Sequence, residues 1–335
     1  MKKKNNSFKE IWDKLKKCKR VAMTLHYGPD GDSLGSCGAM KYVLEREFGC
    51  KVTLVSNHDL SENLKGYDFV REIEFGKDVS ELNGADYDAF VFVDGGAIGY
   101  YSGKLKDKYL GPNETIVINL DHHASNTYFG DLNYVDIESP AACSVLVDLF
   151  RSQNVKFDRE LSNRLLIGVF TDSGFFTYDT GPKKALEDAL FLINNGADYL
   201  NYILRPILYN QPLKMKKYLG ILFTNLKSSG KVGYSSISHK DIKGLGLNES
   251  EVRLGVNELQ FIKEFDLIFT LSEMGDYIKG SFRTKKGIDV SEYAKALGGG
   301  GHKAAAAFFL DKMPLDKAEK KVLEAIEKVR NSKKD

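Results

Sequence analysis

Continuous apolar runs recur along the first half of the chain, and polar or turn-forming residues bound each of them. Their richness in Val, Ile and Phe predicts buried strands at 21–25, 51–56, 89–93 and 115–120. Apolar residues at helical spacing predict helices at 34–48, 139–152 and from 158 through 169. A capping box of Ser7 and Glu10 predicts a helix before the first strand. Because the first strand is followed by a loop, a helix and a second strand, we expect an α/β fold with a doubly wound, mainly parallel sheet.

The pattern changes after a further helix at 182–195. Pro206 and Pro212 interrupt the helical spacing, so we place a linker and a connecting helix at 196–225. Beyond this segment, strands are expected at 231–238, 267–271 and 277–283, and helices at 290–297 and 315–329. A length of 335 residues suggests roughly two domains, which we place at 1–195 and, as a smaller α/β domain, at 226–335.

Composition narrows the classes of protein that fit. The net charge is +2, from 48 basic and 46 acidic residues, which argues against a long duplex nucleic acid as partner. The four cysteines form no C-x-x-C pair, which argues against a disulfide framework or a structural zinc site and is typical of a cytoplasmic protein. No run approaches the ~20 apolar residues of a membrane span, so we expect no membrane partner.

Metal-competent side chains follow three of the predicted strands. His26 ends the first, Asp94 follows the third, and Asp121, His122 and His123 follow the fourth. The carboxyl ends of parallel strands meet at one edge of a sheet, where ligands bind in open α/β folds. A single histidine pair at a strand end could be merely solvated or part of the core, but the coincidence over several strands favours a site.

Further carboxylates join this edge from the loop after the first strand and from the end of the helix before residue 173. The candidate metal ligands are His26, Asp30, Asp32, Asp94, His122 and Asp172. This mixture of carboxylates and imidazoles suits manganese or another divalent ion of similar hardness, and it lacks the thiolates that select zinc. The set is too large for one catalytic ion with open positions, and it fits two ions that Asp94 bridges.

The remaining residues of the triplet suggest roles beside the metal site. His123 is a candidate catalytic group that contacts a phosphate oxygen or protonates the leaving oxygen. Asp121 could instead orient one of the imidazoles, as carboxylates near metal sites commonly do. Two divalent ions ~3.5–4 Å apart can clamp a phosphoryl group, so the expected reaction is phosphoester hydrolysis.

Other motifs in the first loop fail when they are counted. An EF-hand that starts at Asp30 would need an acid or amide at Leu34 and Glu at Lys41. Gly31-Asp32-Ser33-Leu34 matches the start of a GDSL esterase, but no Asp-x-x-His sequence occurs downstream. An Asp-x-Asp phosphatase nucleophile would leave the histidines unexplained.

A glycine run near the C-terminal end offers a second candidate binding element. Gly298 to Gly301 precede His302 and Lys303, and backbone N–H groups in such a loop can approach a phosphate. Arg283 adds a planar donor for anions. A tight crossing of two backbones is the structural alternative for the same glycines.

Taken together, these motifs resemble the DHH phosphoesterase superfamily, and within it the RecJ-like branch of bifunctional oligoribonucleases, 3′-phosphoadenosine 5′-phosphate phosphatases and cyclic dinucleotide hydrolases. The resemblance rests on His26-x-x-x-Asp30-Gly31-Asp32, Asp94, Asp121-His122-His123, Thr171 to Gly174, and Gly298 to His302. It covers nearly the whole chain. It implies a DHH catalytic domain and a DHH-associated C-terminal domain, as two lobes around a cleft.

The resemblance also implies roles for individual residues. His26, Asp30 and Asp94 would hold one Mn²⁺, with Mg²⁺ or Co²⁺ as substitutes, and Asp32, Asp94, His122 and Asp172 would hold a second. His123 would face the scissile phosphate. The substrate would be bound by Arg283, Gly300, Gly301 and His302.

The implied activities are hydrolysis of very short RNA oligonucleotides to mononucleotides and removal of the 3′ phosphate from 3′-phosphoadenosine 5′-phosphate. Two alternatives stay open: a phosphodiesterase for cyclic di-AMP or linear dinucleotides, and a non-catalytic nucleotide-binding protein. The expected partners are short RNA or small nucleotides, and a homodimer is compatible with the sequence.

Overall fold

The computed structural model describes residues 4–105, 115–178, 180–209, 212–285, 287–301 and 303–332. The chain divides into two compact units, Met1–Asn210 and Gln211–Asp335. The division falls inside the segment 196–225 that we expect to connect the domains.

The first unit is built on a parallel six-stranded sheet with the strand order β3-β2-β1-β4-β5-β6. Its strands are β1 (Arg20–Thr24), β2 (Lys51–Ser56), β3 (Ile73–Phe75), β4 (Ala89–Val93), β5 (Ile116–Asp121) and β6 (Leu132–Val135). The four strands predicted from the apolar runs agree with β1, β2, β4 and β5 to within one residue. The expected α/β class with a mainly parallel sheet is thereby confirmed.

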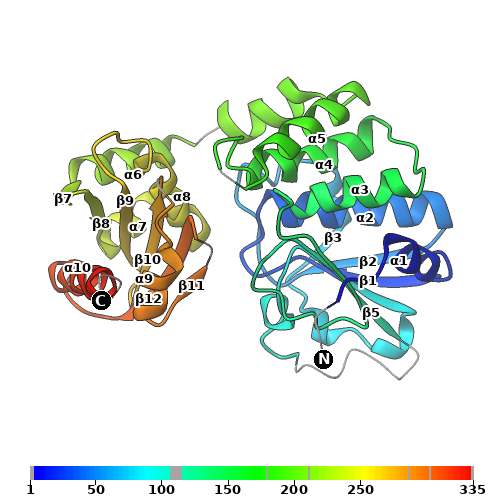
Figure 1. The fold of residues 1–335 in the computed structure, drawn as a ribbon, viewed down its shortest axis with the longest axis horizontal. Helices are drawn as coiled ribbons and strands as arrows, with labels where there is room; N and C mark the ends of the chain where they lie inside the picture. The colour runs from blue at the N-terminus through cyan, green and yellow to red at the C-terminus, as the bar shows by residue number, and fades with distance from the viewer. Residues whose placement is uncertain are drawn as a thin grey trace. The chain divides into compact units, whose positions relative to one another are not determined.

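Helices cover the two faces of this sheet unequally. The long ones are α1 (Phe8–Leu15), α2 (Gly31–Phe48), α3 (Ala142–Ser152), α4 (Arg159–Asp172), α5 (Pro182–Asn194) and the π-helix η5 (Tyr199–Tyr209). Figure 1 shows α2 to α5 gathered on one side of the sheet. The short 3₁₀ turns are η1 (Asp68–Glu72), η2 (Val79–Glu81), η3 (Gly84–Asp86) and η4 (Ile98–Tyr100). Residues of η2 and η4 close a second, smaller core on the other face, against Phe90 and Phe92.

Three predicted helix limits are wrong, each for a local reason. Helix α2 begins at Gly31, inside the expected loop, because the Asp30 carboxylate accepts the Asp32 and Ser33 N–H groups. Helix α3 begins at Ala142 rather than Ser139. Its N-cap residue is Ala141, whose side chain makes no capping hydrogen bond. The helix η5 continues through Pro206, where we expected the helical spacing to be interrupted. Ile203 and Ile207, on either side of Pro206, are buried in the core and hold this segment in place.

Glycines allow α2 and α4 to pack unusually close together. A Cβ at Gly35 would lie 2.5 Å from the Arg164 carbonyl oxygen, and one at Gly31 would lie 2.3 Å from the Thr171 hydroxyl. Atoms cannot approach that closely, so both positions need glycine. The contact brings the start of α2 beside the end of α4.

Side chains near the N-terminal end pair with the outer edge of β6. The Asn5 amide donates to the Val135 carbonyl and accepts the Val135 N–H, at 2.9 Å in both cases. The Asn6 N–H donates to the Asn133 carbonyl at 2.8 Å, and the Asn6 side chain accepts the Asn133 N–H at 3.0 Å. These two asparagines therefore satisfy backbone groups that an edge strand would otherwise expose.

The second unit has a mixed six-stranded sheet with the strand order β11-β12-β10-β9-β8-β7. Among its described strands β8 and β9 pair in parallel, and the other pairs are antiparallel. Its strands are β7 (Lys227–Ser229), β8 (Val232–Ile237), β9 (Leu267–Glu273), β10 (Tyr277–Thr284), β11 (Gly300–Gly301) and β12 (Ala305–Asp311). Its helices are α6 (Leu213–Thr224), α7 (His239–Leu245), α8 (Glu249–Leu259), α9 (Val290–Ala296) and α10 (Leu315–Asn331). Helices α6 to α8 form a core on one face of the sheet, and α9 and α10 form one on the other.

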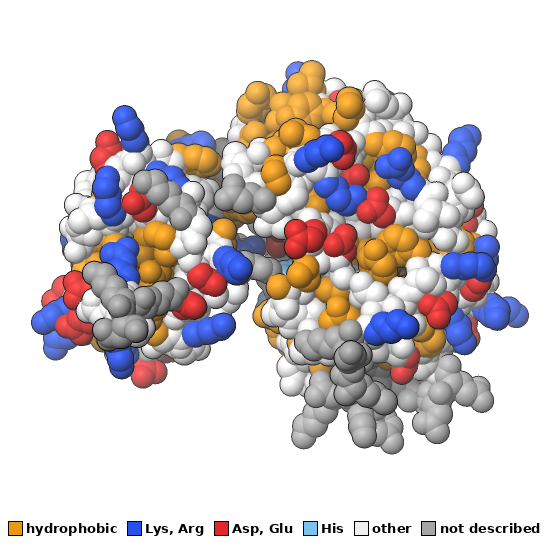
Figure 2. All heavy atoms as spheres, in the orientation of Figure 1, with side chains coloured by type: hydrophobic (Ala, Val, Ile, Leu, Met, Phe, Trp, Pro, Cys, Tyr) orange, Lys and Arg blue, Asp and Glu red, His pale blue; other side chains and the backbone are white. Residues whose placement is uncertain are grey.

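Helix α5 carries a stripe of exposed apolar side chains. Leu186, Leu190 and Ile193 are 55%, 61% and 38% exposed and recur at the spacing of one helix face. Figure 2 shows hydrophobic side chains gathered at the top of the first unit.

The homodimer with which the sequence is compatible stays a prediction. Among the described residues no helix has the length and apolar character to span a membrane, and the cytoplasmic location also stays a prediction.

We expect Gly35→Ala to destabilise the first unit, because the new methyl group must push α4 away from α2. Overpacking of this kind costs about 1–3 kcal/mol, which corresponds to several degrees in melting temperature. Thermal unfolding monitored by circular dichroism checks this. Gly99→Ala is the matched control, since a Cβ there meets no atom within 4 Å. Equal melting temperatures for the two variants would contradict the packing argument.

Candidate active site

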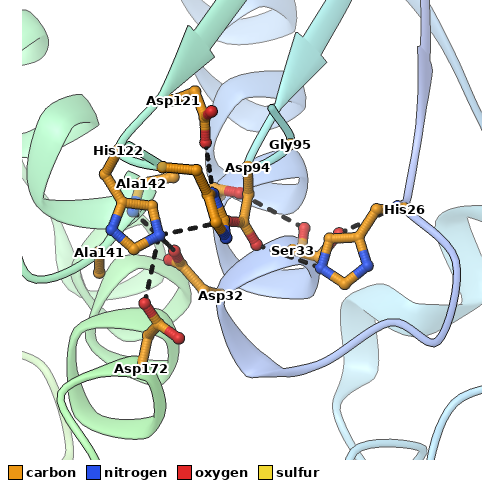
Figure 3. Close-up of polar contacts among 12 residues, drawn as sticks. His26, Asp32, Ser33, Asp94, Gly95, Asp121, His122, Ala141, Ala142 and Asp172 are labelled. Carbon is orange, nitrogen blue, oxygen red and sulfur yellow. Dashed lines mark hydrogen bonds and ion pairs between the residues drawn. The ribbon is translucent and has the colours of Figure 1, made fainter. Parts of the chain in front are cut away.

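All six candidate metal ligands converge at the carboxyl edge of the parallel sheet. Figure 3 shows His26, Asp32, Asp94, His122 and Asp172 there. His26, Asp94 and His122 come from the ends of β1, β4 and β5, which are neighbours in the sheet. The start of α2 adds Asp30 and Asp32, and the end of α4 adds Asp172. The close packing of these two helices therefore completes a site that the strand ends begin.

His26, Asp30 and Asp94 form one group, whose ligand atoms all lie within 4.8 Å of one another. The His26 Nε2 atom is 3.6 Å from Asp30 Oδ1 and 3.3 Å from Asp94 Oδ2. These separations leave room between the three side chains for a cation that all of them contact.

Asp32, His122 and Asp172 form a second group within the same limit. The His122 Nε2 atom lies 3.2 Å from Asp172 Oδ2 and 3.9 Å from Asp32 Oδ2. It is also 3.5 Å from Asp94 Oδ1, whereas His26 faces Asp94 Oδ2. Asp94 thus presents one carboxylate oxygen to each group, which is the arrangement of a bridging ligand.

The imidazole rings are oriented for coordination through Nε2. The Nδ1 atom of His26 is 2.9 Å from the Tyr27 carbonyl, and that of His122 is 3.2 Å from the Ser139 carbonyl. A carbonyl can only accept, so Nδ1 carries the proton in each bond and a neutral ring keeps its lone pair on Nε2. The buried His122 Nε2 has no hydrogen-bond partner among the described residues. These features fit a divalent ion held by oxygen and imidazole ligands.

Asp32 has a second task that its motif does not reveal. Its Oδ2 accepts the Ala142 N–H at 2.6 Å and its Oδ1 accepts the Cys143 N–H at 2.9 Å. These donors belong to the first turn of α3, so a carboxylate of α2 caps a helix that has no cap of its own. A Cβ at Gly168 of α4 would lie only 2.3 Å from Asp32 Oδ1, so this glycine leaves space for the carboxylate.

Asp94 adopts a left-handed backbone conformation with a φ of 66°. This conformation is costly for a residue with a side chain, and it recurs at functional sites where the surroundings hold it in place. The Asp94 N–H donates to the Leu120 carbonyl at 3.0 Å, and the Asn119 side chain donates to the Gly95 carbonyl at 3.2 Å. These bonds from β5 fix the turn that aims the carboxylate.

A chain of buried side chains orients His123. The His123 Nδ1 atom lies 2.7 Å from Asp121 Oδ1, and Asp121 Oδ2 accepts the Asn126 side-chain N–H at 2.6 Å. The same Asn126 side chain donates to Asn119 Oδ1 at 2.8 Å. The imidazole that Asp121 orients is therefore that of His123. Asn119 and Asn126 were not predicted, although an asparagine within the apolar run 115–120 is a signal that could have pointed to the first of them.

Burial and mutual charge shift the pKa values of the site. Burial, together with Asp94 and Asp172, raises the pKa of Asp32 well above its ordinary value, and burial with Asp94 raises that of Asp172 to about 6. Burial would also raise the pKa of Asp94, but its close contacts with the His122 and His26 imidazoles outweigh this and hold it well below the usual range. Burial lowers the pKa of both imidazoles, yet the surrounding carboxylates raise it well above normal. Without a metal, the site therefore retains protons.

Arg283, Gly300 and Gly301, which are expected to bind substrate, lie in the second unit. His302, the fourth residue of this prediction, is outside the described residues. Arg283 is half-buried on β10, where its Nε donates to Asn257 Oδ1 of α8 at 2.9 Å and its Nη1 to the Phe282 carbonyl at 2.8 Å. Asn257, which was not predicted, thus orients the guanidinium. No sequence pattern marks it.

Gly300 and Gly301 form the exposed edge strand β11, paired with β12. A Cβ at Gly301 would lie 2.5 Å from Ala306 Cα, and one at Gly299 would lie 2.1 Å from the Ala307 carbonyl oxygen. Close packing against β12 therefore requires glycine at two positions of the run, 299 and 301. This supports the tight crossing of two backbones. Gly300 and Gly301 are themselves exposed.

Family models match both units. The N-terminal domain of the DHH family matches residues 20–169, and the DHHA1 domain matches residues 229–331. The chain therefore belongs to the DHH family of phosphoesterases and is a hydrolytic enzyme.

Named relatives cover most of the chain. The bifunctional oligoribonuclease and PAP phosphatase NrnA of Thermus thermophilus is 25% identical over 91% of this chain and 89% of its own length. A probable enzyme of the same name from Streptococcus mutans is 27% identical over 90% of this chain and 92% of its own. These similarities agree with the branch of the family that the sequence motifs resemble.

Solved structures support the fold. An exopolyphosphatase-related protein from Bacteroides fragilis superposes with a TM-score of 0.86 at 18% identity, over 98% of this chain and 97% of its own. RecJ of Thermus thermophilus in complex with Mn²⁺ gives a TM-score of 0.59 at 15% identity, over 95% of this chain and 53% of its own.

We expect metal binding to strengthen as pH rises, because an incoming ion must displace protons from His26, His122 and Asp172. Below a pH of about 6, the pKa of Asp172, that carboxyl is protonated and binds poorly. Calorimetric titration with MnCl₂ at pH 5.5 and 7.5 should show tighter binding at the higher pH, and an observed heat that changes with the ionisation enthalpy of the buffer because protons are released. Equal affinity at both values would contradict this reading of the site.

We expect Asn126→Ala to lower phosphodiester turnover about tenfold to hundredfold, the range seen when residues that orient active-site ligands are removed. The Asp121 carboxylate would lose a donor, and His123 would lose its fixed position. Initial rates with bis(p-nitrophenyl) phosphate and Mn²⁺ measure this, and calorimetry should show Mn²⁺ affinity within about twofold of the parent. A variant with unchanged turnover would rule out a role for this chain of hydrogen bonds.

Proposed function

We propose that the protein is a manganese-dependent phosphodiesterase that degrades very short oligoribonucleotides to mononucleotides, with 3′-phosphoadenosine 5′-phosphate phosphatase activity. The observation that carries the proposal is the pair of ligand groups that share Asp94, with His123 beside them. The names of the Thermus and Streptococcus relatives supply the substrate class.

The metal ligands would divide between two ions. His26, Asp30 and Asp94 would hold one, and Asp94, Asp32, His122 and Asp172 the other. RecJ structures in complex with Mn²⁺ and Mg²⁺ support a divalent ion in this fold. When bound, two such ions polarise a phosphoryl group and lower the pKa of a water molecule.

His123 is the group proposed to act directly on the substrate. Its Nδ1 is 3.8 Å from Asp94 Oδ1, so the ring lies against the shared ligand. The Asp121 hydrogen bond outweighs burial and raises the pKa of His123, which favours the protonated ring near neutral pH. A protonated His123 donates to a phosphate oxygen or gives its proton to the leaving oxygen, and Asp121 stabilises its charge.

The second unit is proposed to grip the phosphates of the substrate. Arg283, held by Asn257, would bind an anion through its guanidinium, and Gly300, Gly301 and His302 would offer backbone and imidazole donors. Near-neutral overall charge fits a substrate of a few nucleotides better than a long polymer.

The test is mononucleotide release from 5′-labelled RNA of two to ten residues, with Mn²⁺ and then with a chelator, beside cyclic di-AMP. We expect metal-dependent turnover that is fastest for the shortest RNAs. Asp94→Asn should lower the rate by more than about 10³-fold, because it removes a ligand from both groups. Leu186→Ala, on the exposed face of α5, is the matched control.

Two results would redirect the proposal. Cleavage of cyclic di-AMP with indifference to RNA would assign the same site to cyclic dinucleotides. Binding of nucleotides without turnover under any divalent metal would indicate a non-catalytic nucleotide-binding protein, against the complete ligand set.

A further inference from the structure

A pair of aromatic rings lies at the same sheet edge as the metal ligands, one strand further out. Tyr27 directly follows the ligand His26 after β1, and His58 follows β2, the neighbour of β1 on the side away from β4. Their ring centroids are 4.6 Å apart with an edge-to-face angle of 62°. We propose that Tyr27 and His58 form a stacking subsite for one nucleobase of the substrate.

The backbone around His58 is held firmly. The buried Ser56 hydroxyl donates to the His58 carbonyl at 2.6 Å and accepts the His58 N–H at 3.3 Å. The next residue back, Asn57, donates from its side chain to Asp78 Oδ2 at 3.3 Å. A ring on a fixed backbone loses little conformational freedom when a ligand stacks on it.

Tyr27 is fixed at both ends of the residue. Its hydroxyl accepts the Gly103 N–H at 2.6 Å, and its own N–H donates to the Tyr100 carbonyl at 2.6 Å. Its carbonyl accepts the proton of His26 Nδ1, so the backbone that orients a metal ligand also carries the aromatic ring. The position of the ring is therefore tied to the position of the metal group.

The fold itself does not require the His58 ring. The residue is exposed, and among the described residues its imidazole nitrogens make no hydrogen bond. An edge-to-face pair leaves ring faces that the pair does not cover. The His58 ring is therefore accessible to a ligand that stacks on it.

The position suits a base whose phosphate lies at the metal ligands. Neighbouring strands lie about 4.8 Å apart, so the ends of β2 and β4 are separated by roughly 10 Å, which is comparable to the length of one nucleotide. Every nucleobase has a flat face that stacks on aromatic side chains without regard to sequence. The subsite rests on the proposed function, since it assumes that the phosphate belongs to a nucleotide.

The test compares AMP with ribose 5-phosphate, which lacks the base, by calorimetry on the full chain with Mn²⁺. We expect the parent protein to bind AMP about tenfold more tightly. His58→Ala should remove most of this preference and leave the affinity for ribose 5-phosphate within about twofold. His58→Phe, which keeps an aromatic ring, should restore it.

Three outcomes overturn the subsite: no preference for AMP in the parent, an unchanged preference in His58→Ala, or an equal loss of affinity for both ligands. The proposed function fails separately. If the RNA series is not hydrolysed but the AMP preference depends on His58, the subsite stands and the oligoribonuclease assignment falls.

Discussion

The repulsion among buried carboxylates at the sheet edge is the constraint on which the rest of the site depends. Asp32 is almost fully buried, and Asp94 and Asp172 both act to raise its pKa. The structure offsets this with the first N–H groups of α3, with imidazoles on two strands, and with retained protons. Such a cluster of carboxylates is unfavourable without a cation, and a bound cation would offset the repulsion. Stability and metal binding are linked in sites of this kind for that reason.

The sequence allowed the parallel sheet and the side chains at its strand ends to be predicted, because both follow from short-range patterns. Continuous apolar runs mark β1, β2, β4 and β5, and His26, Asp94 and His122 stand directly at or near their ends. Partnerships between distant segments could not be predicted. Nothing local indicates that Asp32 caps α3, that Asn126 reaches Asn119, or that Gly168 leaves room for a carboxylate.

The second unit shows the same division between local and distant information. The strand predicted at 277–283 placed Arg283 correctly on β10, but its contact with Asn257 depends on how α8 packs against the sheet. The glycine run was weighed as a phosphate loop or as a backbone crossing. Contacts of Gly299 and Gly301 with β12 now give the crossing a physical basis, independent of any ligand.

The pairing of Asn5 and Asn6 with β6 has a practical consequence for handling the protein. Their amides occupy hydrogen-bonding groups at the open border of the sheet, where a strand from another molecule could otherwise add. A purification tag joined immediately before Asn5 would compete with this pairing and expose the β6 edge, which favours aggregation through strand addition. A tag placed after the final helix, or separated from Asn5 by a spacer, would keep that border closed.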